Sequence, residues 1–483
     1  MKKYILLLVM GSLVVGLFSG CDSDLAGINQ SPNAISDKNL NRPEAARALI
    51  VNLQVSTGDW YPDERSRITS VWTRHMCAPP GLGRPQPVSW NTYKMVRDEH
   101  VDRAWIQAYR VVKLANDIIA NVPNISFPGT ATIDGTRMTR LTRNTMIGMA
   151  KFYKALALGE TAAFYGSIPV DVAKRAEDPP PQFVSQSAAY AYVQTLLDEA
   201  LVLFQDSTVT ITQDLNFGTP TLTVSPTHRD RWIRATRSLK ARFYLHVGNY
   251  AAARTEAQNG INAATGTVNA IFNAGLSTEY APWGHWSQTE AGEPLRAAKF
   301  YVDQLRSEAG DTRLAAYLQP GAGTTTIAGY NVDGQAGATT DENTTTRAAR
   351  LLKYRGYGQP FPLISYEETL LIRAEAEARV NGVTAAALAD LNAIRTAAGL
   401  PARTVLDFAS TAAFITEVLK QKYIQLHLEG QAYHDMRRAS EFSLSVLPTG
   451  SSIPVRWIYG QSEQFTNPNC PRNDVGTVRN EVL

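Results

Sequence analysis

RWIRATRSLKARFYLHVGNYAAARTEAQNGI, residues 231–261, is the stretch that decides the fold. The bulky side chain of Tyr244 can fill the space between two helices, and Gly248-Asn249 permits a tight turn after it. Ala253 and Ala257 stand four residues apart, so they share one face of a second helix, where small side chains allow close packing. The stretch therefore predicts two helices that are joined by a tight turn and packed against each other.

The spacing of these residues is that of a tetratricopeptide helix-turn-helix, a unit in which paired helices stack into a scaffold. A similar pair is predicted between Ser365 and Gly399. Its first helix, YEETLLIRAEAEARV, stops at Asn381-Gly382, and its second, TAAALADLNAIRTAAG, stops at Gly399 with Pro401 just beyond. The two pairs predict an all-α fold built on a tetratricopeptide-like helical-repeat scaffold.

Further helices are predicted where apolar and small residues recur at helical spacing, in residues 101–121, 143–164, 188–204 and 414–440. Aromatic stripes at this spacing are typical of a packed core. We therefore expect core positions for Trp105, Tyr109, Tyr153, Tyr244 and Tyr366.

Between the helices lie stretches that are rich in turn-forming residues. Residues 59–91 contain PPGLGRPQP, residues 178–181 read DPPP, and residues 321–346 are rich in Thr, Gly and Ala. Long irregular stretches are uncommon in compact domains unless they carry a function. We therefore expect large loops on one helical scaffold, with no linker that divides it.

The N-terminus has the features of an export signal that ends at a cysteine. Lys2 and Lys3 precede an apolar run of about 15 residues, which is shorter than the roughly 20 residues of a membrane-spanning helix. Ser19-Gly20-Cys21 follows this run, and a cysteine in that place is the acceptor pattern for bacterial lipoprotein acylation. We expect a lipid-anchored, exported protein. The alternative is an ordinary signal peptide with a chance cysteine.

Composition narrows the class of partner. The formal net charge is +3, and removal of Lys2 and Lys3 leaves +1, which argues against nucleic acid as a ligand. No later apolar segment approaches membrane-spanning length. Two cysteines remain after Cys21, namely Cys77 and Cys470, and a disulfide between them is left open.

Six short segments in chain order carry a family signature: INQSPN (28–33), DTRL (311–314), ISYEETLLIRAEA (364–376), YIQLHLEGQAYHDMRR (423–438), RWIYGQSE (456–463) and NPN (467–469). Together they resemble the SusD/RagB family, and in particular its SusD-like nutrient-binding outer-membrane lipoproteins. Gly460 and Thr312 depart from the pattern, since the family usually has proline there. We expect these two departures to change the shape of local turns and not the family to which the chain is assigned.

The resemblance implies a tetratricopeptide-like helical fold with a large loop-rich ligand-binding portion, and no cofactor, metal or catalytic residue. It implies residues 1–20 as signal peptide, 21–40 as lipid-anchored tether and 41–483 as one SusD-like α-helical domain. Such a lipoprotein sits over a SusC-like TonB-dependent transporter, facing the cell exterior, and passes nutrient to it. Asp22 and Asp24 loosely resemble the signal that sends these lipoproteins to the outer leaflet.

Aromatic residues in loops are the candidates for ligand contact, because flat rings suit the apolar faces of sugars and also suit peptides. The first group lies in residues 59–91 and comprises Trp60, Tyr61, Trp72, His75 and Trp90. The second lies in EYAPWGHWSQTEAGE, where Pro282 and Gly284 are expected to prevent a helix, and comprises Tyr280, Trp283, His285 and Trp286. A weaker third group is Tyr354-Arg355-Gly356-Tyr357. The alternative role for all of these rings is to fasten the loops onto the scaffold.

Enzyme signatures are weak in this chain. Its seven histidines form no HExxH, and no G-x-S-x-G is present. We therefore predict a non-catalytic, oligosaccharide-binding surface lipoprotein. Three alternatives remain: a peptide- or glycopeptide-binding subunit, an envelope interaction scaffold that binds no nutrient, and a hydrolase whose carboxylate pair the sequence does not reveal.

Overall fold

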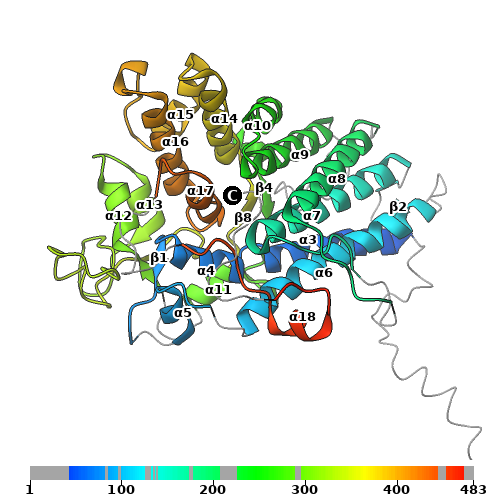
Figure 1. Ribbon diagram of the computed structural model, residues 1–483, viewed down its shortest axis with the longest axis horizontal. Helices are drawn as coiled ribbons and strands as arrows, with labels where there is room; N and C mark the ends of the chain where they lie inside the picture. Colours follow the sequence, from blue (N-terminus) through cyan, green and yellow to red (C-terminus); the bar gives the residue numbers. More distant parts are fainter. Residues whose placement is uncertain are drawn as a thin grey trace, which may run out of the picture.

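Helices form most of the architecture, which confirms the predicted all-α class (Figure 1). The computed structural model describes residues 43–81, 85–95, 99–125, 132–133, 136–137, 140–172, 178–206, 226–288, 295–443 and 453–472. Cys21, the predicted signal peptide and the predicted tether lie outside these residues.

The helices of the described residues are, in chain order, α3 (Pro43–Trp60), α4 (Glu64–Trp72), α5 (Pro85–Trp90), α6 (Glu99–Asn121), α7 (Arg140–Tyr165), α8 (Gln186–Asp206), α9 (Pro226–His246), α10 (Tyr250–Gln258), α11 (Pro282–Gln288), α12 (Lys299–Arg306), α13 (Arg313–Tyr317), α14 (Tyr366–Asn381), α15 (Ala385–Ala397), α16 (Thr411–Gln425), α17 (Gln431–Arg438) and α18 (Gln461–Thr466). Short strands pair antiparallel in twos: β1 (Met76–Cys77) with β5 (Arg296–Ala297), β2 (Thr132–Ile133) with β3 (Thr136–Arg137), β4 (Val268–Ala270) with β8 (Phe361–Ile364), and β6 (Leu318–Gln319) with β7 (Arg350–Leu351).

The two predicted helical pairs are present. Between α9 and α10, Gly248 has a φ of +71°, a left-handed conformation that glycine adopts without strain, and Asn249 caps α10 by accepting the Ala252 amide. Ala253 is fully buried, as the close packing of the pair requires. Between α14 and α15, Gly382 has a φ of +78° and ends the first helix as predicted.

Neighbouring helices stack side by side in the order α6, α7, α8, α9, α10 and α14, and α14 packs against both α15 and α16. The helices α8 to α10 and α14 to α16 form a fan in the upper part of Figure 1. Small residues set the spacing of this stack. A Cβ added to Gly159 of α7 would lie 2.2 Å from the ring of Phe243 on α9, so only glycine fits there. The helical-repeat scaffold is therefore held together by direct packing of helix against helix.

The prediction of one helix over residues 414–440 is wrong in its middle. The helix α16 ends at Gln425 and α17 begins at Gln431. Between them Leu428 and Gly430 have φ values of +70° and +86°, and the carbonyl of Leu428 accepts a hydrogen bond from Ser66 on α4. A contact with a distant part of the chain thus fixes a turn that the helical periodicity does not reveal.

Residues 59–91 are also more regular than predicted, because they contain α4 and α5. Residues 64–72 (ERSRITSVW) contain neither proline nor glycine, and most of their side chains are buried in α4. By contrast, residues 321–346 are irregular as predicted and form the yellow-green loop at the left of Figure 1. Arg74 fastens this loop through an ion pair with Asp333 at 2.8 Å.

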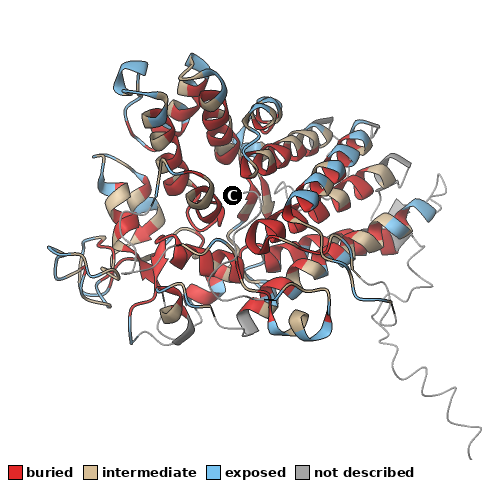
Figure 2. Cartoon of the chain, in the orientation of Figure 1, coloured by how far each residue is buried: buried red, intermediate tan, exposed pale blue. Residues whose placement is uncertain are grey.

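The buried residues lie where the helices face one another and where the short helices α4 and α11 meet the scaffold (Figure 2). Trp105 and Tyr153 are buried in the main core, as predicted. Tyr109, Tyr244 and Tyr366 are half-buried and pack against the core from its edge. Within the described residues, no helix is long and apolar enough to cross a membrane.

Candidate ligand-binding site

Trp283 and Trp286 lie on the short helix α11, so the prediction that Pro282 and Gly284 prevent a helix is wrong. Proline is tolerated in the first turn of a helix, because its missing N–H would have no intrahelical partner there. The two tryptophans are only 2% and 5% exposed, and their rings meet edge to face at 5.9 Å. The Trp283 indole donates a hydrogen bond to Ser66 at 2.9 Å. In this conformation both rings are core residues.

The predicted aromatics of the first group are buried as well. Trp60, Tyr61, Trp72 and Trp90 all belong to the main core. The Tyr61 ring lies 3.5 Å from the guanidinium of Arg65. The structure brings the segments of the first two groups together, because Arg67 of α4, which lies within residues 59–91, stacks 4.6 Å from the ring of Trp286 on α11. Any ligand contact by these buried rings stays a prediction.

The rings of Tyr280 and Tyr357 lie nearly parallel, 4.0 Å apart at an angle of 15°. Both tyrosines are half-buried, and the exposed His285 lies with its ring 6.2 Å from that of Tyr280. We call Tyr280 and Tyr357 the tyrosine platform. It joins the second group of the sequence analysis to the third.

The helix α11 is held firmly against the turn that carries Tyr357. The amide of Ala281 donates a hydrogen bond to the Tyr357 carbonyl at 2.7 Å, and the side chain of Gln288 donates to the carbonyl of Arg355. A Cβ added to Gly284 would lie 2.6 Å from the carbonyl oxygen of Gly356, so glycine is required for this approach. The platform therefore rests on a rigid base.

A stacked aromatic pair with half-buried rings can bind an apolar ring face. Each tyrosine uses one face for its partner, and the part of each side chain that stays exposed is available to solvent or ligand. Sugar rings have an apolar face with hydroxyl groups at its edge. An aromatic ring can contact the apolar face of such a ligand, and a tyrosine hydroxyl can hydrogen-bond to its hydroxyl groups. The geometry suits non-covalent capture.

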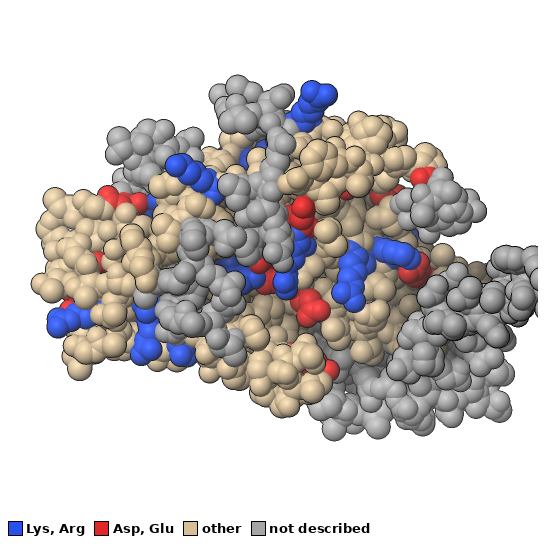
Figure 3. Space-filling view, turned by 90° about the horizontal axis from the view of Figure 1, so that it is seen from below, with Lys and Arg blue, Asp and Glu red and all other residues tan. Residues whose placement is uncertain are grey.

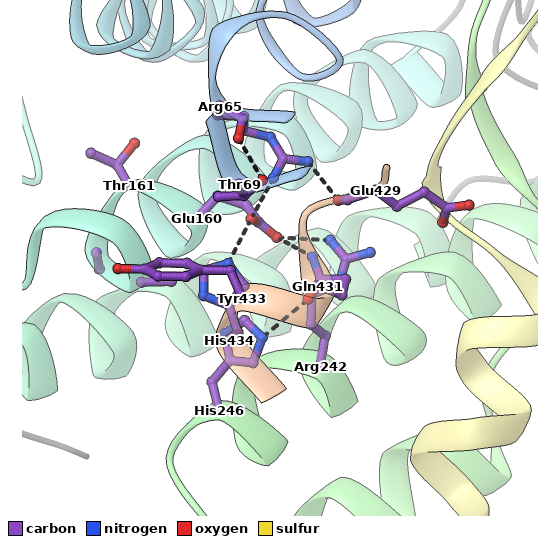
Figure 4. A network of polar contacts seen from close by, with 12 residues as sticks. Arg65, Thr69, Glu160, Thr161, Arg242, His246, Glu429, Gln431, Tyr433 and His434 are labelled. Carbon is purple, nitrogen blue, oxygen red and sulfur yellow. Dashed lines mark hydrogen bonds and ion pairs between the residues drawn. The ribbon is translucent and has the colours of Figure 1, made fainter. Parts of the chain in front are cut away.

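A network of buried ion pairs lies at the centre of the fold, with Glu160 of α7 in its middle (Figure 4). Arg65 of α4 lies 3.2 Å from one carboxylate oxygen of Glu160, and Arg242 of α9 lies 3.0 Å from the other. Gln431 of α17 donates to the same carboxylate at 3.0 Å. Burial alone would raise the pKa of Glu160, but Arg65, His434 and Arg242 together hold it well below its usual value.

Arg242 extends this network to the second helical pair. Its guanidinium makes two hydrogen bonds to Glu368 of α14, at 2.6 and 2.5 Å, and one to the hydroxyl of Tyr61 at 3.0 Å. Glu160 and Glu368 thus share one guanidinium and are both buried. Because each carboxylate is ion-paired away from solvent, this pair is unsuited to the acid–base work of a glycoside hydrolase. Its role is to join distant segments.

Of the network residues, Glu160 and Arg242 are absent from the sequence-based candidates, whereas Tyr61 is among them. Glu160 stands among small residues in GMAKFYKALALGE. A charged residue on a helix face of small residues is the only signal in the sequence that could have identified it. Its partners Arg65 and Arg242 are 95 and 82 residues away along the chain. The sequence shows the charges but not their pairing.

Three further observations on the described residues concern metal binding, disulfide formation and surface charge. Among them, no group of three His, Cys, Asp or Glu side chains could hold a metal ion. Cys77 and Cys470 are free thiols, so the disulfide left open by the sequence is not formed. On the face seen in Figure 3, basic side chains lie beside acidic ones and do not gather in one basic patch.

Comparison with known proteins identifies the family. The family profile described as "Starch-binding associating with outer membrane" matches residues 38–459. The chain belongs to the SusD-like family. The resemblance seen in the sequence is thus confirmed, and the family's association with the outer membrane agrees with the predicted location. A search of curated protein sequences finds no match to this SusD-like chain.

Solved structures share its fold. A SusD/RagB family protein from Bacteroides thetaiotaomicron has 17% identity and a TM-score of 0.64, with 88% of this chain and 94% of that chain covered. A chitin-binding SusD homologue from Flavobacterium johnsoniae has 16% identity and a TM-score of 0.64, with 88% and 93% covered. A SusD superfamily protein from Parabacteroides distasonis has 16% identity and a TM-score of 0.64, with 90% and 99% covered. At these identities the likeness concerns the fold alone.

Proposed function

We propose that this SusD-like chain is a cell-surface lipoprotein that captures oligosaccharide and passes it to a SusC-like, TonB-dependent transporter of the outer membrane. The observation that carries this proposal is the tyrosine platform, a stacked and half-buried aromatic pair on a rigid base. Two descriptions support a glycan as the ligand. The family profile is described as starch-binding, and one structural neighbour is described as chitin-binding.

Anchoring through acylated Cys21 belongs to the same proposal. The cysteine directly follows the predicted export signal, and the family is described as associating with the outer membrane. Two or more acyl chains on one residue suffice to hold a soluble body at a bilayer. A tether of about 20 residues would then let the domain reach a neighbouring transporter.

A second candidate is an envelope interaction scaffold that binds no nutrient. The burial of Trp283 and Trp286 favours it, because the most prominent predicted ligand contacts pack the fold instead. A rigid apolar tip also favours it: Val405 and Leu406 are 53% and 92% exposed in a turn that the capping box of Thr404 and Asp407 closes. A scaffold would use such a tip to contact another protein.

A parallel screen against a glycan array and a peptide library separates these possibilities. The probe is the chain without residues 1–21, compared with a variant that carries Tyr280→Ala and Tyr357→Ala. We expect retention on glycans by the wild-type protein and its loss in the variant. Retention on peptides alone would replace the glycan with a peptide as the ligand. Binding to neither library would favour the scaffold.

A further inference from the structure

Tyr357 of the platform is carried by a turn, residues 353–357, that contains an unfavourable backbone conformation. Tyr354 has a φ of +63°, in the left-handed region that bulky L-residues avoid. Such a conformation persists only where surrounding contacts hold it. The ring of Tyr354 packs on Phe361 at 4.6 Å, and its hydroxyl donates a hydrogen bond of 2.8 Å to the buried carboxyl group of Glu429.

Glu429 lies in a second turn of the same kind, which separates α16 from α17. The neighbouring residue Leu428 has a φ of +70°. The backbone carbonyl of Glu429 accepts a hydrogen bond from Arg65 at 3.2 Å. The carboxyl group of Glu429 also lies 3.3 Å from the ammonium of Lys353, which in turn donates to the Gln425 carbonyl at 2.9 Å. Two strained turns, distant in sequence, therefore meet at one buried carboxyl group.

We propose that Glu429 is a positioning residue for the tyrosine platform, because it holds the 353–357 turn where Tyr357 stacks on Tyr280. Tyr357 lies three residues after Tyr354, and its carbonyl receives the amide of Ala281 at 2.7 Å. A change in the backbone at Tyr354 therefore moves Tyr357 relative to Tyr280. The inference rests on the proposed function, since it gives a role to the surface that we propose to bind glycan.

The contact is sensitive to pH. Burial raises the pKa of Glu429 to about 7, against the opposing effects of Lys353 and Tyr354. The charged and titratable groups that act on this carboxyl group from packed elements are Lys353 and Tyr354 of the turn and Glu368 of α14. Arg65 of α4 bonds to the backbone carbonyl of Glu429 and not to its carboxyl group. On its own segment, burial lowers the pKa of His427 and of His434, so both are neutral at neutral pH.

The direction of the effect follows from linkage. Opening of the turn exposes Glu429 to water, where its pKa returns toward the ordinary value of about 4.5. The closed turn therefore binds a proton more tightly than the open one, and acid favours the closed turn. Between pH 4.5 and 7, each rise of one pH unit favours opening by up to about tenfold. The platform is thus most ordered in mildly acidic medium.

Hydrogen exchange followed by mass spectrometry tests this inference without a ligand. Exchange of the peptides that contain residues 281 and 353–359 is measured at pH 5, 6, 7 and 7.5 and divided by the intrinsic rate. In the wild-type protein we expect protection to fall as pH rises. Glu429→Gln keeps an oxygen that accepts from Tyr354 but cannot ionise, so its protection stays high and constant. The control Glu256→Gln, which removes an ion-paired carboxylate on α10, should keep the wild-type pH dependence.

A second variant keeps the test decisive if Glu429→Gln does not fold. Tyr354→Phe removes only the hydroxyl that contacts Glu429, so we expect lower protection at every pH. Wild-type protection that does not change with pH, or an unchanged pH dependence in Glu429→Gln, would overturn the inference. Because no ligand is present, such a failure is distinct from a failure of the glycan-binding proposal.

Discussion

Replacement of Arg242 by Met is the sharpest test of the buried ion network. Arg242 lies on α9, and its guanidinium bonds to Glu160 of α7, Glu368 of α14, the Tyr61 hydroxyl and the Leu363 carbonyl. The substitution keeps a long side chain in the same space but removes the charge and these hydrogen bonds. Two buried carboxylates then lose a shared cation.

The expected magnitude follows from this environment. Removal of one partner from a buried ion pair costs about 3–5 kcal/mol, because an uncompensated charge stays away from water. A whole domain is stable by only about 5–15 kcal/mol, so this loss is a large part of the total. Replacement of Glu368 by Met in the same chain removes one of the stranded charges. The double variant should therefore recover part of the loss.

The assay is urea unfolding followed by circular dichroism, with Arg237→Met as a matched control on the same helix. Arg237 pairs with Glu256 at 2.9 Å, but its side chain is 28% exposed. Loss of such a pair costs less than about 1 kcal/mol. If Arg242→Met lowers the free energy of unfolding by no more than Arg237→Met does, the network does not hold the fold together.

Three further predictions concern separate parts of the chain. Gly284→Ala should lower the free energy of unfolding by about 1–3 kcal/mol, because its Cβ would lie 2.6 Å from the Gly356 carbonyl oxygen; unchanged urea unfolding would show that α11 moves away freely. Burial lowers the pKa of His434 to about 4, so between pH 7 and 5 this group should remove about 2 kcal/mol of wild-type stability. His434→Gln should lack that loss in urea unfolding, and an identical pH dependence in both proteins would contradict the assignment. Cys21→Ala should shift the protein from the membrane pellet to the soluble fraction, and unchanged fractionation would rule out the lipid anchor.

Much of the scaffold was predictable, because its signals are local. The helical pair around Gly248 follows from side-chain spacing and one turn residue, and both act within a few positions of each other. The break between α16 and α17 was not predictable in the same way. It depends on Leu428 adopting a left-handed conformation, with its carbonyl bonded to Ser66, 362 residues away in sequence.

The candidate site was predictable only in part, for a related reason. Trp283 and Trp286 stand among turn-forming residues, but both are buried, and the indole of Trp283 donates a hydrogen bond to Ser66, 217 residues away. Tyr280 and Tyr357 were separate candidates, and tertiary contacts such as the Ala281–Tyr357 hydrogen bond and the approach of Gly284 to Gly356 bring their segments together. Sequence composition identifies aromatic residues, whereas exposure and pairing are decided by tertiary contacts.

Isothermal titration calorimetry tests the central claim, that the tyrosine platform binds glycan, most directly. The chain without residues 1–21 is titrated with maltohexaose and with N-acetylchitohexaose, beside Tyr357→Ala and the control Tyr250→Ala. Tyr250 is a half-buried tyrosine on α10, which lies in the upper part of Figure 1, whereas α11 lies in the lower part. We predict that Tyr357→Ala weakens binding at least about tenfold, or 1.4 kcal/mol, and that Tyr250→Ala leaves binding unchanged. Equal affinities in all three proteins would contradict the account.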